Sequence, residues 1–208
     1  MVTYPGLPGP VISDFLAREA SRGHYAEGTT FHIARIRMVA NTGTYVDAPF
    51  HRYAGREDIA AVPLERLADL EGIVVNVSGA ESDRAIGEEP FSGRDLARKA
   101  VLVRTGWDAH WRTARYFERH PHLTRGAAEL LAAAGPALVG IDSLNIDDTE
   151  DPVRPAHTLL LAAGIPIVEH LCHLGDLPDS GFRFHCAPAP FVGLGSFPVR
   201  AYAVLDRP

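Results

Sequence analysis

An aspartate and a histidine four residues apart stand in a segment that glycine and proline interrupt. The segment reads Asn-Thr-Gly-Thr-Tyr-Val-Asp-Ala-Pro-Phe-His over residues 41–51 and carries Asp47 and His51. Carboxylates and imidazoles are the groups that enzymes use to move protons and to hold metal ions. By itself the segment also fits a surface turn with a solvated histidine. Its chemistry therefore depends on which other side chains meet it.

A second pair of candidates lies far downstream. His157 begins an apolar stretch that predicts a short helix, and Glu169 follows the apolar run 165–168, which predicts a strand. Local pattern alone gives neither residue a chemical role.

The segment 41–51 resembles the signature of the cyclase family, which contains enzymes of the kynurenine formamidase and isatin hydrolase type. That signature reads His-x-Gly-Thr-His-x-Asp-x-Pro-x-His, and this sequence matches it at Gly43, Thr44, Asp47, Pro49 and His51. Asn41 and Tyr45 stand where the family has two metal-binding histidines. The resemblance therefore implies a metal site with a reduced set of ligands.

The resemblance continues downstream through Gly140-Ile141-Asp142, the His157 helix, the stretch 164–169 and the C-terminal block 193–201. It implies an α/β fold of the cyclase-like β/β/α type around a central mixed sheet. We expect one domain over residues 1–208, in which the Pro- and Gly-rich residues 1–10 form an extended N-terminal arm.

The resemblance also implies a chemistry, namely hydrolysis of a small amide, lactam or ester, or the reverse reaction as a ring closure. Asp47, His157 and Glu169 would hold a metal, and the expected catalytic residues are His51, Tyr45 and Asn41. The resemblance therefore implies that Asp47, His51, His157 and Glu169 face one pocket. His51 would act as the general base or as a fourth ligand, and Tyr45 would donate a hydrogen bond to a developing oxyanion.

Three alternatives stay open at this point. One divalent metal, zinc or manganese, remains in the pocket, or the pocket works without a metal. A metal-independent enzyme would be a cyclase or dehydratase acting on a polyketide-like or aromatic intermediate. A protein without catalysis would bind a small molecule on the same fold.

Asn41 and Tyr45 lead to a structural prediction of their own. If the pocket remains in use, both side chains point inward, and a buried amide or phenol needs hydrogen-bond partners. We expect direct or water-mediated hydrogen bonds from Asn41 and Tyr45 to Asp47, His157 or Glu169.

The remaining polar residues receive simpler interpretations. His120 and the acidic run 147–151 are expected to be solvated, and His170 is expected to point away from Glu169, because alternate residues of a strand face opposite sides. His185 and Cys186 are candidates to line the pocket.

Composition limits the classes of function. The 208 residues are 46% hydrophobic and 22% charged, as in an ordinary globular domain. A net charge of -6 without a basic cluster argues against nucleic acid as a partner, and no apolar run reaches the ~20 residues of a membrane helix. Two cysteines and a start without signal-peptide features favour a cytoplasmic location. We expect a small-molecule substrate, and the resemblance implies a homodimer or homotetramer.

Alternation of apolar runs with capped polar segments favours an α/β domain. The pattern predicts strands over 31–38, 73–77, 101–104, 137–141, 165–168, 182–184 and 199–205. It predicts helices over 13–22, 93–99, 110–122, 125–134 and 157–163, with Thr124 capping the fourth of them and Gly135 ending it.

Overall fold

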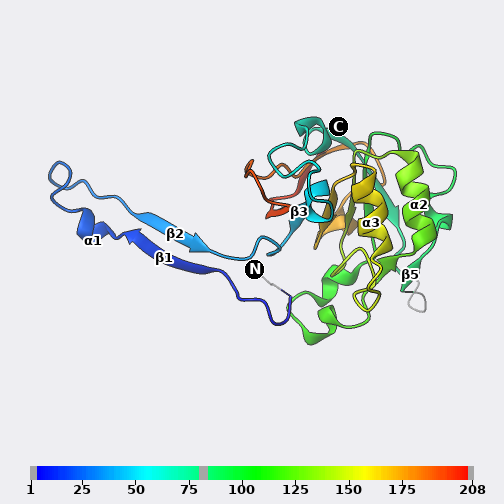
Figure 1. The fold of residues 1–208 in the computed structure, drawn as a ribbon, viewed down its shortest axis with the longest axis horizontal. Helices are drawn as coiled ribbons and strands as arrows, with labels where there is room; N and C mark the ends of the chain where they lie inside the picture. Colours follow the sequence, from blue (N-terminus) through cyan, green and yellow to red (C-terminus); the bar gives the residue numbers. More distant parts are fainter. Residues whose placement is uncertain (1–3, 80–83, 206–208) are drawn as a thin grey trace.

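A curled sheet forms the body of the molecule, and a hairpin projects from it (Figure 1). The computed structural model describes residues 4–79 and 84–205. Within these residues the large sheet has eight strands. Their order is β11 (Ser196–Pro198), β3 (Tyr45–Asp47), β9 (Ile167–Glu169), β8 (Leu138–Ile141), β6 (Ala100–Arg104), β4 (Leu70–Asn76), β10 (Phe182–His185) and β12 (Tyr202–Leu205).

The centre of the sheet is parallel and its two edges are antiparallel. β4, β6, β8 and β9 run parallel, while β3 with β11 and β10 with β12 add antiparallel pairs on either side. The central strands are short apolar runs, as expected for parallel strands buried on both faces. The predicted mixed α/β fold is confirmed.

Two helices cover one face of the sheet. α2 (Arg125–Ala134) and α3 (Pro155–Ala162) pack against each other and against the side chains of β6 and β8. The Thr124 side chain accepts a hydrogen bond from Ala127 N, and Gly135 takes the left-handed conformation at φ 66°. The predicted cap and end of this helix are therefore confirmed.

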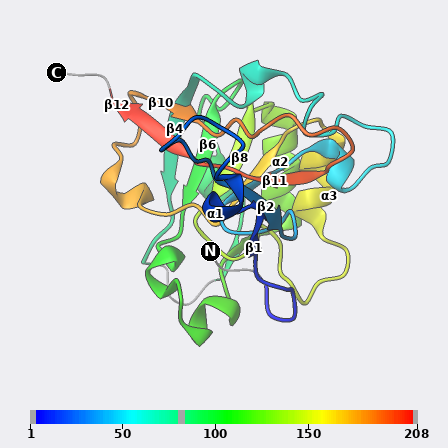
Figure 2. The ribbon, with the colours of Figure 1, turned by 90° about the vertical axis from the view of Figure 1, so that its left-hand side faces the viewer.

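The projecting hairpin is built from β1 (Val11–Leu16) and β2 (Ile33–Arg37), with the single-turn α1 (Arg18–Ser21) between them (Figure 2). The predicted helix over 13–22 is wrong for its first half, because strand pairing overrides the local helix propensity. Residues 4–10 contain a turn closed by Leu7 N and the Tyr4 carbonyl, and residues 1–3 of the predicted arm lie outside the described residues.

Two further predicted helices do not form. The stretch 93–99 is a series of turns, and 110–122 holds short 3-10 turns followed by β7 (His122–Leu123), which pairs with β5 (Ala85–Ile86). Arg98, Arg112 and Arg119 have φ values of 60°, 67° and 50°. A left-handed residue interrupts a right-handed helix, which explains both errors.

In the part of the chain that the structure describes, the helices are too short or too polar to span a lipid bilayer.

Candidate metal and acid-base site

β3 places two candidates on one face, because Tyr45 and Asp47 are two residues apart in a strand. Tyr45 lies directly opposite Glu169 of β9, and Asp47 lies directly opposite Ser196 of β11. Side chains that oppose each other across neighbouring strands share a face and touch. The register therefore gathers these four buried side chains, while Val46 points into the core.

His157 lies in the first turn of α3, and its side chain reaches the buried side chains of β3 and β9. Asp147 holds the His157 side chain in this position. Oδ2 of Asp147 accepts a hydrogen bond from His157 N at 2.9 Å and lies 2.6 Å from His157 Nδ1, while Oδ1 accepts from Ala156 N at 2.6 Å. The other ring nitrogen, Nε2, lies 3.5 Å from Asp47 and 3.7 Å from Glu169. Asp147 thus caps the helix and orients the imidazole, as carboxylates do behind metal-binding histidines.

The Glu169 carboxylate accepts hydrogen bonds on both oxygens. Oε1 accepts from Ile146 N at 2.7 Å. Oε2 accepts from the Tyr45 hydroxyl, from Asn145 Nδ2 at 3.3 Å and from the Tyr4 hydroxyl at 3.3 Å. The carboxylate is therefore held in one orientation with few lone pairs to spare.

The predicted hydrogen bonds of Asn41 and Tyr45 are confirmed. Tyr45 donates directly to Glu169, and Asn41 Nδ2 donates to Asp47 Oδ1 at 3.4 Å. Both side chains therefore point into the pocket, where each donates a hydrogen bond to one oxygen of a carboxylate.

His51 forms the more exposed side of the cluster. Its Nδ1 lies 2.9 Å from Ser196 Oγ and 3.7 Å from Asp47 Oδ1, and Ser196 Oγ also donates to Asp47. The His51 and His157 rings are 5.9 Å apart. A Cβ at Gly195 would lie 2.5 Å from His51 Cα, so only glycine permits this approach.

The electrostatics of the cluster favour a positive charge. Burial, and to a smaller extent the charge of Asp47, raises the pKa of Glu169 to about 7. Burial opposes a charge on His157, but its hydrogen bond to Asp147 and the nearby carboxylates of Asp47 and Glu169 raise its pKa to about 10. Burial and Glu169 raise the pKa of Tyr45 well above its ordinary value, so Tyr45 stays protonated. Three carboxylates thus surround one imidazole.

The donor set fits one divalent metal. Ligand atoms of Asp47, His51 and His157 all lie within 4.8 Å of one another. Among the described residues, Asp47 Oδ2 is buried without a hydrogen-bond partner, which leaves a lone pair for a cation. This trio differs from the set that the sequence predicts, because His51 takes the place of Glu169. One carboxylate and two imidazoles suit zinc or manganese.

Several residues of the cluster received no role from the sequence: Tyr4, Asn145, Asp147 and Ser196. The prediction that the acidic run is solvated is wrong for Asp147, which is fully buried. The first backbone N–H groups of α3 have no acceptor within the helix, so the sequence could have indicated that a nearby acidic residue caps it.

Two histidines differ from their predictions. His120 is buried rather than solvated, and burial lowers its pKa to about 4. His170 has φ 57°, so the alternation of the strand ends before it. Its ring lies 5.4 Å from that of Tyr45, and its Nδ1 lies 2.8 Å from the Tyr116 hydroxyl. His170 therefore packs behind the cluster instead of pointing away from it.

The pocket in front of the cluster has a volume of about 510 Å³. Arg52, Val153 and Arg154 line it. The other described residues that line it are Tyr4, Leu7, Asn41, Tyr45, His51, Asn145, Pro152, His157 and Glu169. The prediction for His185 and Cys186 is wrong, since His185 stacks on Tyr202 with ring centroids 4.7 Å apart and Cys186 is buried in the core.

Comparison with known proteins shows the family. Residues 9–148 match the family model named Cyclase, described as "Putative cyclase". The chain belongs to the cyclase family. It is 27% identical over 175 residues to kynurenine formamidase of Bacillus cereus (strain ATCC 14579), a match that covers 84% of this chain and 81% of that relative.

Solved structures support the fold assignment of this cyclase-family chain. Isatin hydrolase A from Labrenzia aggregata aligns with a TM-score of 0.82 at 23% identity, covering 100% of this chain and 88% of that one. A structure described as a potential metal-dependent hydrolase with cyclase activity aligns with a TM-score of 0.74 at 24% identity, covering 96% and 100%. The predicted family membership is confirmed.

Proposed function

We propose that this cyclase-family protein is a metal-dependent hydrolase that opens the C–N bond of a small amide or lactam. The observation that carries the proposal is the convergence of Asp47, His51 and His157, with the partnerless Asp47 Oδ2 among them. The relatives named for kynurenine formamidase and isatin hydrolase activity support the class of bond.

Asp47, His51 and His157 would hold the metal. A divalent metal bound there would lower the pKa of a water molecule and polarise the carbonyl of the substrate. The imidazole of His157 is turned toward this position by Asp147, and His51 by Ser196. The protein thus contributes a fixed geometry, which catalysis by a positioned ion requires.

Glu169 is the group that we propose to transfer protons. Glu169 lines the pocket with Oε1 3.7 Å from the proposed ligand His157, and burial raises the pKa of its carboxyl to about 7, which suits proton transfer near neutral pH. Glu169 would take a proton from the attacking water and return it to the leaving nitrogen. The hydroxyl of Tyr45, which donates to Glu169, would hold the carboxylate in place during both transfers.

Two arginines at the pocket would select the substrate. Arg52 and Arg154 line the same cavity as Glu169, and Arg154 is fixed by a 3.1 Å hydrogen bond from its Nη1 to Asn145 Oδ1. Guanidinium groups bind carboxylates and carbonyl oxygens. We therefore favour an amide or lactam that carries an acidic group or a second carbonyl.

Turnover of isatin and N-formylkynurenine, measured before and after chelation, tests the proposal. Glu169→Gln should reduce the rate by roughly 10²–10⁴-fold, the usual contribution of a general acid-base group. His51→Ala should lose metal and activity together. Glu129→Gln on the exposed face of α2 is the matched control and should keep full activity.

Full activity after chelation would contradict the proposal and favour the metal-independent cyclase or dehydratase. Tight binding of both compounds without turnover would favour a binding protein. Full activity of Glu169→Gln would contradict the role of Glu169.

A further inference from the structure

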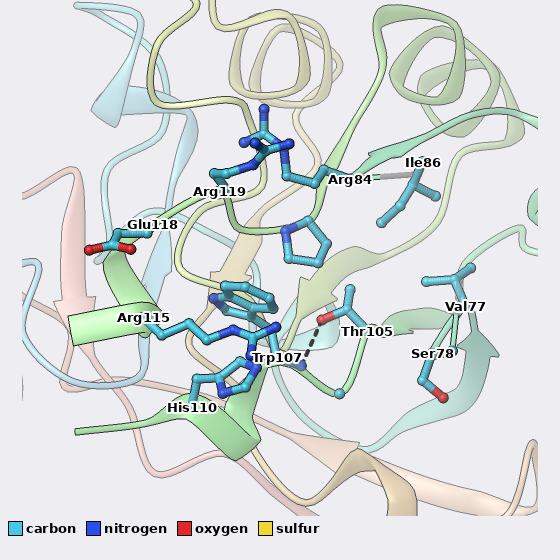
Figure 3. Close-up of a pocket in the computed structure, with 13 residues that line it drawn as sticks. Val77, Ser78, Arg84, Ile86, Thr105, Trp107, His110, Arg115, Glu118 and Arg119 are labelled. Atoms are coloured by element: carbon cyan, nitrogen blue, oxygen red, sulfur yellow. Dashed lines mark hydrogen bonds between the residues drawn. The ribbon is translucent and has the colours of Figure 1, made fainter. Parts of the chain in front are cut away.

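A second cavity opens at the carboxyl ends of β4 and β6 (Figure 3). Its volume is about 610 Å³, within the range of pockets that bind small molecules. Among the described residues, none that lines this cavity also lines the pocket of the metal site. The ends of parallel strands are where open α/β sheets bind ligands.

A buried carboxylate makes the floor of this cavity rigid. Asp142, which is 1% exposed, accepts hydrogen bonds from Thr105 N at 2.7 Å, Thr105 Oγ1 at 2.6 Å and Gly106 N at 2.9 Å. Trp107 N in turn donates to Thr105 Oγ1 at 3.1 Å. The turn after β6 is therefore fixed before any ligand arrives, which lowers the entropy cost of binding.

The described walls of the cavity carry more positive than negative charge. Among the described residues that line it, Arg84, Arg115 and Arg119 are basic and Glu118 is acidic. In the described chain, the arginines that pair with carboxylates lie elsewhere: Arg56, Arg125 and Arg183. No ion pair with a described carboxylate therefore holds the three guanidinium groups of the cavity, although the charge of Arg84 is close enough to Asp148 to help lower the pKa of that carboxyl. An anion from solution can bind these groups.

An aromatic surface lies next to these charges. The Trp107 indole is held by a hydrogen bond from its Nε1 to the Tyr116 carbonyl at 3.0 Å, and the Arg115 guanidinium lies 5.6 Å from its ring. Figure 3 shows Arg115 beside Trp107 and His110, with Arg84 and Arg119 on another side of the cavity. The cavity thus has the Trp107 ring with Arg115 on one side, and Arg84 with Arg119 on another.

We propose that this cavity binds an aromatic phosphate ester of nucleoside-monophosphate size. Arginine presents two parallel N–H donors that match the oxygens of a phosphate, so Arg84 and Arg119 would hold that group. The base would stack against Trp107 and Arg115.

Titration with adenosine 5′-monophosphate, followed by tryptophan fluorescence, tests this site. The chain has two tryptophans, so Trp111→Phe leaves Trp107 as the reporter. Adenosine 5′-monophosphate should change the fluorescence of that variant in a saturable manner, and neutral adenosine should not. Arg84→Gln with Arg119→Gln should weaken binding by roughly a hundredfold, about tenfold for each charge-assisted contact.

Matched controls separate charge from folding. Arg94→Gln with Arg125→Gln removes two exposed arginines outside the cavity and should leave affinity unchanged. Arg84→Lys with Arg119→Lys keeps the charge but removes the fork of donors, and should bind with intermediate affinity. No saturable response to millimolar nucleotide, equal binding of adenosine, or full affinity in the glutamine variant would overturn the proposal. Hydrolase activity does not enter these measurements, so failure here leaves the proposed function untouched.

Discussion

Asp147 is the side chain that connects the start of α3 to the metal site. Its carboxylate contacts His157 Nδ1 and two backbone N–H groups, so a change there alters the orientation of one ligand. Asp147→Asn keeps an acceptor for the helix but loses the charge, and should reduce zinc affinity roughly 10–100-fold, as loss of such partners does. Isothermal titration with zinc measures the effect, and Asp148→Asn is the neighbouring control. Equal affinity in the two variants would contradict the assigned role.

The sequence shows which residue types are present at the site, but it does not show which side chains form hydrogen bonds with each other. The convergence of Asp47, His51, His157 and Glu169 could be predicted because the resemblance to the family signature and to its downstream block singles these residues out. For Asp147, the backbone donors at the start of α3 indicated that an acceptor was needed, but only the fold decides which of the acidic residues 147–151 is buried to supply it. Ser196 depended on the register between β3 and β11, a non-local property that local pattern does not contain.

Asn41 and Tyr45 allow a test of the second metal position that the family signature implies. Both side chains point into the pocket and bond its carboxylates. Asn41→His with Tyr45→His supplies two further imidazoles, and we expect the metal content to rise above one per chain. Elemental analysis measures this directly, and circular dichroism verifies folding. A folded double variant with no additional metal would show that the pocket has been remodelled beyond these two side chains.

At the level of elements, His51 is positioned by the close contact between Gly195, the residue just before β11, and the turn that follows β3. A Cβ at Gly195 would lie 2.5 Å from His51 Cα and 2.7 Å from His51 N, and backbone atoms cannot give way cheaply. Gly195→Ala should therefore displace His51, weaken metal binding and destabilise the fold by roughly 1–3 kcal/mol. Thermal unfolding and metal titration test it. Gly87→Ala, where a Cβ meets open space, should change neither quantity.

Elements with strong local signals were predictable, and those decided by distant contacts were not. The helix 125–134 has a cap, an apolar stripe and a terminal glycine, and all three act locally. The stretches 93–99 and 110–122 have helical composition, but left-handed residues at Arg98, Arg112 and Arg119 interrupt them. Nothing in the local pattern identifies an arginine as left-handed.

At the scale of the molecule, the hairpin of β1 and β2 extends away from the body, and most of its side chains are exposed (Figure 1). A lone two-stranded hairpin is marginally stable, yet Ile12 and Ile36, which pair across it, are 70% and 62% exposed. We propose that a second copy of this chain covers this face, in agreement with the homodimer or homotetramer that the resemblance implies. On the body, the neighbouring Phe191 and Val192 are also exposed, at 48% and 84%.

Light scattering with size-exclusion chromatography measures the assembly. The wild-type protein should have the mass of a dimer or a tetramer, and Ile12→Asp with Ile36→Asp should have the mass of one chain. Ser13→Asp adds a charge on the opposite face of the hairpin and should leave the mass unchanged. A monomeric wild-type protein would contradict the proposed contact.

We propose that Asp47, His51 and His157 hold one metal ion per chain. Elemental analysis of protein loaded with zinc or manganese and then dialysed measures this ion directly. We expect one ion per chain in the wild type and loss of that ion in both Asp47→Asn and His157→Ala, while Asp148→Asn retains it. No ion or two ions in the wild type, or an ion that remains after either substitution, would contradict it.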